Sequence, residues 1–232
     1  MNIALFGYGK MGKMLEKLGT ARGHSIVAKL DEGSGNPDFT SVDVAIDFST
    51  PDAAFDNIER CFEANIPIIS GTTGWLARYE EAVALCKRKK GAFIYASNFS
   101  LGVNLFFALN RQLAHMIKGH GYQVALEEIH HTQKLDAPSG TAISLAEGIM
   151  AEAGYSGWSL DETEANKVLI SSVREGTVPG THTIDYTSAV DTIRIQHTAH
   201  NREGFALGAL IAAEWIVGKQ GVFSMKDVLN LG

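Results

Sequence analysis

The segment NIALFGYGKMG (residues 2–12) joins a short apolar run to three glycines spaced as G-x-G-x-x-G. The apolar run predicts a buried strand, and the residues from Lys10 onward predict a helix. In such a strand–turn–helix, Gly7 permits the tight turn, Gly9 lets backbone N–H groups approach a pyrophosphate, and Gly12 allows close packing of helix on strand. The helix N-terminus then faces the anion. The segment therefore predicts a dinucleotide site, with a glycine-rich turn that binds no ligand as the alternative.

Short β-rich runs alternate with helical patterns over the first hundred residues. The predicted strands are residues 3–6, 25–30, 42–48, 66–70 and 92–96, and the predicted helices are residues 10–22, 51–64 and 76–89. This alternation is typical of an α/β fold of the Rossmann type, with a doubly wound parallel sheet. Every predicted strand except the second is strongly apolar, as expected for strands covered on both faces.

The order of predicted helices and strands changes in the second half of the chain. Helices are predicted at residues 104–118, 140–153 and 203–217, and strands at residues 122–130, 167–174, 181–187 and 192–198. The middle of this half predicts a second α+β domain built on an open mixed or antiparallel sheet. The last helix resembles those of the first domain. We therefore expect a dinucleotide-binding domain of residues 1–101 and 202–232, and a substrate-binding and oligomerisation domain of residues 102–201.

Polar residues follow several predicted strands, at the edge where open α/β sheets bind ligands. Asp31 follows the second strand, 22 residues after Gly9, where an acid accepts hydrogen bonds from ribose hydroxyls. A solvated loop acid is the alternative. The sequences SGTTG (residues 70–74) and ASNFS (residues 96–100) follow the fourth and fifth strands. Either of these two segments could equally form only a turn and bind no ligand.

The end of the second strand also predicts the choice of cofactor. A 2′-phosphate beside Asp31 and Glu32 would bring about two negative charges against carboxylates. Residues 33–37 contain no arginine to bind that phosphate, and Lys10 and Lys13 are better placed for the pyrophosphate. We therefore expect NADH to be preferred and NADPH to be accepted.

Residues able to take part in catalysis or binding are most concentrated in EIHHTQKLDAPSGTA (residues 128–142). This segment runs from a predicted strand end through a loop into a predicted helix. Pro138 stops the preceding structure, Ser139 can cap the helix, and Gly140 leaves its N–H group bare of any Cβ. Uncovered N–H groups at a helix start bind anions. This segment therefore predicts a seat for a carboxylate.

Two histidines and a lysine precede that seat. His130 has an ordinary pKa near 6.5, which suits acid–base chemistry at neutral pH, and Lys134 adds positive charge. Structural histidines and a solvated loop lysine are the alternatives. Adjacent strand residues point to opposite faces, and no cysteine or H-x-x-x-H spacing accompanies His130 and His131. We therefore expect no metal site.

Composition limits the classes of partner. The 232 residues are 45% hydrophobic, and 20 Lys+Arg against 26 Asp+Glu give a net charge of −6. Because no positive excess exists to neutralise a phosphate backbone, nucleic acid is not expected as a partner. Cys61 and Cys86 lie in helical patterns, which favours buried, inert thiols and a reducing compartment. Neither an export signal nor a membrane span is expected, so we expect a cytoplasmic protein.

Residues 128–142 match the signature Glu-x-His-His-x-x-Lys-x-Asp-x-Pro-Ser-Gly-Thr-Ala at every specified place. On this segment the chain resembles the 4-hydroxy-tetrahydrodipicolinate reductase (dihydrodipicolinate reductase) family. The resemblance extends to the glycine loop and to residues 47–49, 71–73, 98–104, 173–176, 180–183 and 202–206. It implies hydride transfer from NAD(P)H to a cyclic dicarboxylate in the diaminopimelate route to lysine, by a cytoplasmic homotetramer assembled through the second domain.

The resemblance also implies roles for individual residues. His130 would be the catalytic acid/base, Lys134 a proton donor and substrate contact, and His131, Ser139, Gly140 and Thr141 substrate-binding residues. The nicotinamide cofactor would be held by Gly7, Tyr8, Gly9, Lys10, Met11, Gly12, Asp31, Phe48, Gly71, Thr72, Thr73, Ala96, Ser97, Asn98 and Phe99. The chain departs from the family in being shorter around residues 32–42 and after Ala153, and in placing Glu32 where an arginine is expected in NADPH-using relatives.

Two other functions fit parts of the sequence. A non-catalytic sensor of the nicotinamide ratio would share the first domain, but it has no need for a proton donor beside a carboxylate seat. Another short-chain dicarboxylate or semialdehyde reductase would also share the first domain, but it has no reason to carry the whole segment 128–142. Oxidation of the reduced cofactor in the presence of substrate separates the sensor from the two reductases.

Overall fold

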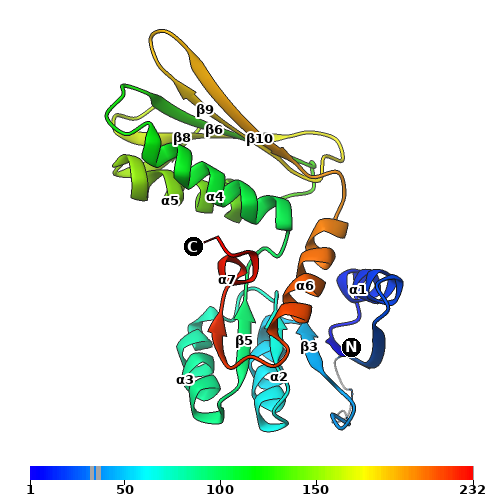
Figure 1. Ribbon diagram of the computed structural model, residues 1–232. Helices are drawn as coiled ribbons and strands as arrows, with labels where there is room; N and C mark the ends of the chain where they lie inside the picture. The colour runs from blue at the N-terminus through cyan, green and yellow to red at the C-terminus, as the bar shows by residue number, and fades with distance from the viewer. Residues whose placement is uncertain (32–33, 35–37, 232) are drawn as a thin grey trace. The chain divides into compact units, whose positions relative to one another are not determined.

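The computed structural model describes residues 1–31, 34 and 38–231, and the chain divides into two compact units (Figure 1). Unit 1 comprises residues 1–101 and 203–232, and unit 2 comprises residues 102–202. These limits differ from the expected domain limits by one residue, Arg202. Unit 1 is therefore discontinuous in sequence, since the chain leaves it, completes unit 2 and returns.

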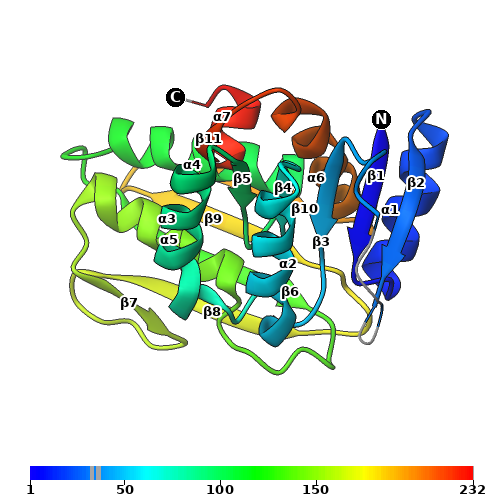
Figure 2. The same cartoon turned by 90° about the horizontal axis from the view of Figure 1, so that it is seen from below.

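Unit 1 contains a six-stranded parallel sheet, which confirms the Rossmann-type fold (Figure 2). Its strands are β1 (Asn2–Phe6), β2 (Ser25–Leu30), β3 (Val44–Asp47), β4 (Ile68–Ser70), β5 (Ala92–Tyr95) and β11 (Gly221–Phe223), in the order β11-β5-β4-β3-β1-β2. β2 alternates between exposed and half-buried residues because it is an edge strand. β11 was not predicted, because three residues are too few to show a period.

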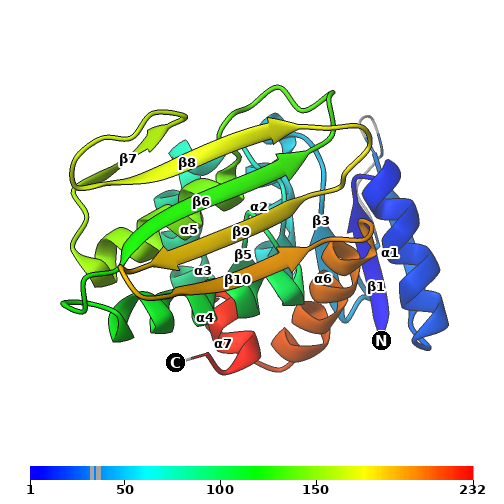
Figure 3. The same cartoon turned by 90° about the horizontal axis from the view of Figure 1, so that it is seen from above.

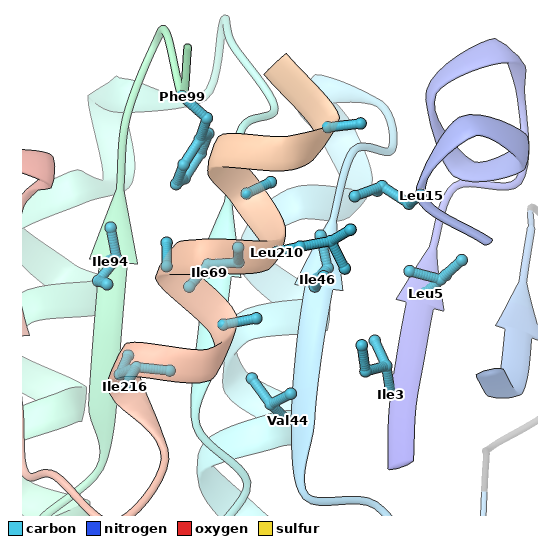
Figure 4. Packing of buried hydrophobic residues seen from close by; sticks show 14 of the residues in the cluster. Ile3, Leu5, Leu15, Val44, Ile46, Ile69, Ile94, Phe99, Leu210 and Ile216 are labelled. Carbon is cyan, nitrogen blue, oxygen red and sulfur yellow. The ribbon is translucent and has the colours of Figure 1, made fainter. Parts of the chain in front are cut away.

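Helices cover both faces of this sheet. α1 (Lys10–Ala21) and α6 (Glu203–Ile216) pack with β1, β3 and β4 in one apolar cluster, and α2 (Pro51–Glu63) and α3 (Tyr79–Lys89) pack in a second cluster. Figure 4 shows Leu210 of α6 over Ile46 of β3, and Ile216 of the same helix toward β5, which carries Ile94. A Cβ on Gly208 would lie 1.8 Å from the carbonyl oxygen of Phe99, so only glycine lets α6 approach so closely.

The ends of some helices differ from the sequence prediction. The helix predicted at residues 76–89 begins as a 3-10 turn, η1 (Leu76–Arg78), before α3. A final short helix, α7 (Met225–Leu229), was not predicted, because five residues do not establish a helical period. No helix in the described part of the chain is both long and apolar enough to cross a membrane.

Unit 2 is built on an open mixed sheet, as predicted, with α4 (Leu101–Met116) and α5 (Gly140–Ala153) against one face (Figure 3). Its strands are β6 (Gln123–His130), β7 (Gly157–Leu160), β8 (Lys167–Arg174), β9 (Thr181–Thr187) and β10 (Thr192–Thr198), in the order β10-β9-β6-β8-β7. β6 is central, parallel to β8 and antiparallel to β9. β7 was not predicted, because its four residues show no alternation.

Candidate active site

The polar centre of unit 2 lies at the carboxyl end of β6. Val124, Leu126, Glu128 and His130 alternate along this strand toward the buried face. The first two join the apolar core, whereas the last two place a carboxylate and an imidazole under the start of α5. Strand register therefore puts these polar groups where the apolar core ends.

Register also supplies the neighbours of Glu128. Glu128 pairs with Ser172 on β8 and with His182 on β9. Two residues further along β6, His130 pairs with Arg174 on β8. All of these residues lie on the same face of the sheet as Glu128, because cross-strand partners share a face. The cluster thus draws on three strands that are distant in sequence.

The Glu128 carboxylate is fully buried and strongly hydrogen-bonded. Its Oε1 accepts from Ser172 Oγ at 2.9 Å and from Arg174 Nη2 at 3.1 Å, and the Ser139 N–H donates to both oxygens at 3.1 and 3.2 Å. Burial raises the pKa of this carboxyl, but the hydrogen bonds together outweigh burial, so the pKa lies below its ordinary value. Glu128 is therefore ionised at neutral pH.

Two imidazoles flank the second oxygen of Glu128. Oε2 lies 3.5 Å from Nδ1 of His130 and 3.7 Å from Nε2 of His182, and the two rings meet nearly edge to face at 5.2 Å between centroids. Burial lowers the pKa of both histidines, opposed by the charge of Glu128, and takes that of His182 to about 4. His182 is therefore neutral at pH 7.

The loop between β6 and α5 is fixed by Arg174. Its guanidinium donates to the carbonyl of Asp136 at 2.6 Å and to the carbonyl of Lys134 at 3.3 Å, in addition to Glu128. The Lys134 ammonium lies 2.7 Å from both carboxylate oxygens of Asp136. Backbone and side chain of Lys134 are thus both held, although the lysine lies in a loop.

The start of α5 has the form that the sequence predicted. Ser139 is the N-cap residue, and its Oγ accepts from the Ala142 N–H at 3.2 Å and lies 3.4 Å from Nε2 of His182. Gly140 is exposed, and a Cβ placed on it would meet no protein atom within 4 Å. Space for a ligand therefore exists beside the first turn of this helix.

The structure brings His130, Lys134 and Ser139 together around Glu128, through the contacts of Arg174 and of Glu128 itself. His131 is half-buried just beyond the end of β6, where its backbone carbonyl accepts from the Lys134 N–H at 3.1 Å. The sequence prediction gave no role to Glu128, Ser172, Arg174 or His182. A signal existed for Glu128, since alternation from Val124 places this acid on the buried face.

Glu128, His130 and His182 also offer three atoms that lie within 4.8 Å of one another, a spacing that could hold a metal ion. Against this, the carboxylate already has a cationic partner, because Arg174 donates to Oε1. A guanidinium at that position repels a second cation, and Ser139 and Ser172 donate to the same carboxylate. An ion pair of Glu128 with Arg174, beside two imidazoles, accounts for the geometry.

A pocket of about 760 Å³ lies at the carboxyl ends of the strands in unit 1. Of the predicted cofactor residues, Gly7, Gly9, Asp31 and Phe48 line it. Gly12 is buried behind the glycine turn, where a Cβ would lie 2.3 Å from the carbonyl oxygen of Gly7. The close helix–strand contact that the glycine spacing predicts is therefore present.

The other predicted cofactor residues lie in α1 or in the segments that follow β1, β4 and β5, outside the lining of this pocket. The Phe48 ring packs on Gly71, where a Cβ would lie 2.2 Å from Cε1, and meets Phe99 edge to face at 6.0 Å between centroids. Thr73 and Ser97 are exposed, as is Lys10. Tyr8, Met11, Thr72, Ala96 and Asn98 do not line the 760 Å³ pocket.

A buried carboxylate orders the loops after β3 and β4. Asp47 accepts hydrogen bonds from Ser49, Ser70, Thr72 and Asn57 at 2.6 to 3.1 Å. Burial raises its pKa, and these hydrogen bonds oppose the increase. The arrangement joins two strand ends that the sequence prediction treated separately.

Asp31 lies where the ribose acid of a dinucleotide fold is expected. Its Oδ1 accepts from the Tyr8 N–H of the glycine turn at 2.6 Å, and its own N–H donates to Ser34 Oγ at 2.9 Å. Close to this strand end, Lys29 forms an ion pair with Glu16 at 2.5 Å and lies over the Tyr8 ring. Glu32 and residues 33 and 35–37 lie outside the described residues.

Both halves of the chain match models of one family. Residues 1–99 match "Dihydrodipicolinate reductase, N-terminus" and residues 102–229 match "Dihydrodipicolinate reductase, C-terminus". Together the two models span nearly the whole chain.

Individual relatives agree with the family models. The chain is 55% identical to the 4-hydroxy-tetrahydrodipicolinate reductase of Christiangramia forsetii, over 99% of this chain and 98% of that protein. It is 36% identical to the enzyme of the same name from Methanoregula boonei, over 82% and 75%. The fold matches a dipicolinate-bound dihydrodipicolinate reductase from Paenisporosarcina sp. TG-14, with a TM-score of 0.77 at 23% identity over 97% of both chains. This chain therefore belongs to the dihydrodipicolinate reductase family.

Proposed function

We propose that His130 donates the proton that completes reduction of a cyclic dicarboxylate bound at the start of α5. As a member of its family, the chain is an oxidoreductase of lysine biosynthesis that acts on 4-hydroxy-tetrahydrodipicolinate with a nicotinamide cofactor. The reaction adds a hydride and a proton to the ring and releases water. The cofactor supplies the hydride when bound, and the chain must supply the proton and the charge that holds the dianion.

The single observation that carries the role of His130 is its place at the end of β6, between an ionised carboxylate and the loop that bears Lys134. Hydride addition to a conjugated ring leaves negative charge on a neighbouring atom, and a positioned acid must neutralise it. Lys134 adds a positive charge and a second donor. Its ion pair with Asp136 holds the ammonium in place before substrate arrives.

Substrate carboxylates are proposed to bind at the first turn of α5. His131, Ser139, Gly140, Thr141 and Lys134 are the residues we assign to this role. Backbone N–H groups at a helix start attract anions, and the exposed Gly140 leaves room for close approach. The relative from Paenisporosarcina sp. is bound to dipicolinate, a planar dicarboxylate of the same class, which supports the assignment.

For the cofactor we propose NADH as the preferred form and NADPH as an accepted one. Unit 1 would bind it through Gly7, Tyr8, Gly9, Lys10, Met11, Gly12, Asp31, Phe48, Gly71, Thr72, Thr73, Ala96, Ser97, Asn98 and Phe99. The Asp31 carboxylate, already ordered by the Tyr8 N–H, suits ribose hydroxyls and repels a 2′-phosphate. We expect a preference of about 1–2 kcal/mol at this exposed position, measured as kcat/KM for both cofactors. A preference for NADPH would refute the assignment.

We also propose a cytoplasmic homotetramer assembled through unit 2. The sheet of unit 2 has α4 and α5 on one face only (Figure 3). On the other face Val173 is exposed, and Ile129, its partner on β6, is half-buried. An uncovered sheet face with apolar side chains is typical of an interface. Light scattering of the purified protein measures the mass directly, and a monomer at micromolar concentration would refute the proposal.

The assignment of His130 is tested by His130→Gln, assayed by loss of absorbance of the reduced cofactor. We expect kcat to fall on the order of 10²-fold with little change in KM, because a general acid contributes about 10²–10⁴-fold and acts in the transition state. The exposed histidine variant His120→Gln serves as the matched control and should keep its activity. Near-full kcat in His130→Gln would remove this residue from the chemistry.

A further inference from the structure

Glu128 is a fully buried, ionised carboxylate in the centre of this site, and the proposed reaction does not use it. We propose that Glu128 is a positioning residue, which holds a proton on Nδ1 of His130 so that Nε2 is the atom that serves the substrate. This inference rests on the proposed role of His130 as the acid. It assigns the orientation and protonation of that acid to a group that never contacts substrate.

The two oxygens of Glu128 have different environments. Oε1 accepts from Ser172 Oγ and from Arg174, which are its partners on β8. Oε2 faces Nδ1 of His130 at 3.5 Å and Nε2 of His182 at 3.7 Å. The Ser139 N–H reaches both oxygens. Hydrogen bonds on one side thus fix the carboxylate so that its other oxygen is directed at the imidazoles.

A carboxylate can only accept hydrogen bonds, so it selects the protonation of the ring that it faces. Among the described residues, Nδ1 of His130 has no hydrogen-bond partner within normal distance, which leaves Oε2 as the acceptor toward which it can tighten. A proton on Nδ1 leaves Nε2 for exchange with a ligand. At rest, Nε2 is therefore the basic nitrogen, and in the imidazolium it is the nitrogen that donates.

Gly180 keeps the Nε2 side of the ring open. A Cβ on this residue would lie 3.1 Å from Nε2 and 3.4 Å from Cδ2 of His130. That distance is within van der Waals contact, so any side chain here would press on the nitrogen. The ring is thus bounded by a carboxylate at Nδ1 and by a glycine at Nε2, an arrangement that distinguishes its two nitrogens.

The charges around His130 give Glu128 a second effect. Burial and the positive charges of Lys134 and Arg174 disfavour the imidazolium, whereas Glu128 and, less strongly, Asp136 favour it. His182 is neutral near pH 7, because burial lowers its pKa to about 4. Removing the charge of Glu128 should therefore lower the pKa of His130, so that kcat falls at a lower pH as the solution is made more alkaline.

A double-mutant cycle tests whether Glu128 acts through His130. We expect Glu128→Gln to lower kcat about 10²-fold in the wild-type background, the lower end of the contribution of a general acid. In the His130→Gln background, the same change should lower kcat less than about 3-fold, because the group on which Glu128 acts is gone. Glu147→Gln is the matched control, since Glu147 is exposed on α5, on the side of the sheet away from the uncovered face.

The outcomes separate this inference from the proposed function. If His130→Gln keeps its kcat, the proposed function fails. In a second outcome, His130→Gln loses kcat, and the fold losses in kcat of the two single variants multiply in the double variant. In that case His130 is the acid but Glu128 has only a general structural role, which overturns the inference. Binding of pyridine-2,6-dicarboxylate within about 2-fold of wild type would show that Glu128→Gln leaves the carboxylate seat intact.

The protonation of His130 can also be measured directly in the wild-type protein. ¹⁵N NMR of the imidazole nitrogens reports which nitrogen of neutral His130 carries the proton, with the signal assigned by comparison to His130→Gln. We expect the proton on Nδ1 in wild type, loss of that preference in Glu128→Gln, and a lower titration midpoint in the same variant. A proton on Nε2 in the wild-type protein would overturn the inference whatever the kinetics show.

Discussion

The buried His182 predicts that unit 2 loses stability as the pH falls from 7 to 5. Its side chain is 5% exposed, and its pKa in the folded unit is about 4, against about 6.5 in an unfolded chain. A group whose pKa is lowered by folding contributes stability that is complete above the unfolded value and is lost below it. Below pH 6.5 the unfolded chain binds a proton on this imidazole that the folded unit does not accept.

The size of the loss follows from the two pKa values. One pKa unit corresponds to about 1.4 kcal/mol, and pH 5 lies about 1.5 pH units below the unfolded pKa and above the folded one. At pH 7 a minority of unfolded chains already carries this proton, which reduces the change slightly. The free energy of unfolding should therefore fall by about 2 kcal/mol between pH 7 and pH 5. Burial also lowers the pKa values of His130 and His197, which add to the loss in the same direction, so the share of His182 is the difference between wild type and a variant that lacks this imidazole.

Denaturant titration of wild type and His182→Gln at pH 7, 6 and 5 measures the effect, with hydrogen exchange of β6 and β9 amides locating it in unit 2. Glutamine does not titrate, so the stability difference between wild type and variant should narrow by about 2 kcal/mol from pH 7 to pH 5. His120→Gln, which removes an imidazole from an exposed position, is the control for the substitution itself. Parallel pH curves for wild type and His182→Gln would refute the account of His182 as a buried neutral imidazole.

Three further predictions concern the two sites. Lys134→Ala should lower kcat and raise KM together, on the order of 10-fold or more each, with cofactor binding unchanged by calorimetry; lost cofactor binding would contradict its assignment to the substrate. Gly140→Val should weaken a planar 2,6-dicarboxylate inhibitor without altering NADH affinity, and equal inhibition of variant and wild type would refute the carboxylate seat. Gly12→Ala places a methyl group 2.3 Å from the Gly7 carbonyl oxygen, so we expect NADH binding to be lost or unit 1 to unfold, as measured by fluorescence titration and thermal melting.

Elements with strong local signals were predicted with accurate limits. The strands at residues 167–174, 181–187 and 192–198 and the helix at residues 140–153 have the limits that the sequence indicates. Alternation fixes the strands, and the Ser139 cap fixes the start of the helix. The short elements β7, β11 and α7 escaped prediction, because their existence depends on pairing or packing with distant residues.

The candidate site likewise contains residues that the sequence indicated and residues that it did not. His130, Lys134 and Ser139 lie within one contiguous segment, so their spacing alone indicated a site. His182 and Arg174 come from other strands, and their proximity to Glu128 depends on β6 lying between β8 and β9. Strand order and register are properties of the assembled sheet, and one sequence without its fold does not contain a local signal for them.

The discontinuity of unit 1 constrains the order in which the protein can form on the ribosome. The first 101 residues emerge with one sheet face covered only by α1, since α6 begins only at Glu203. Unit 2 is continuous, so its residues are all available before the last segment of unit 1 has been translated. Ile46 and Ile69 therefore lack part of their packing until α6 has been synthesised and can close over them. A stop codon before Glu203 would leave a complete unit 2 joined to a nascent sheet that cannot bury its apolar face.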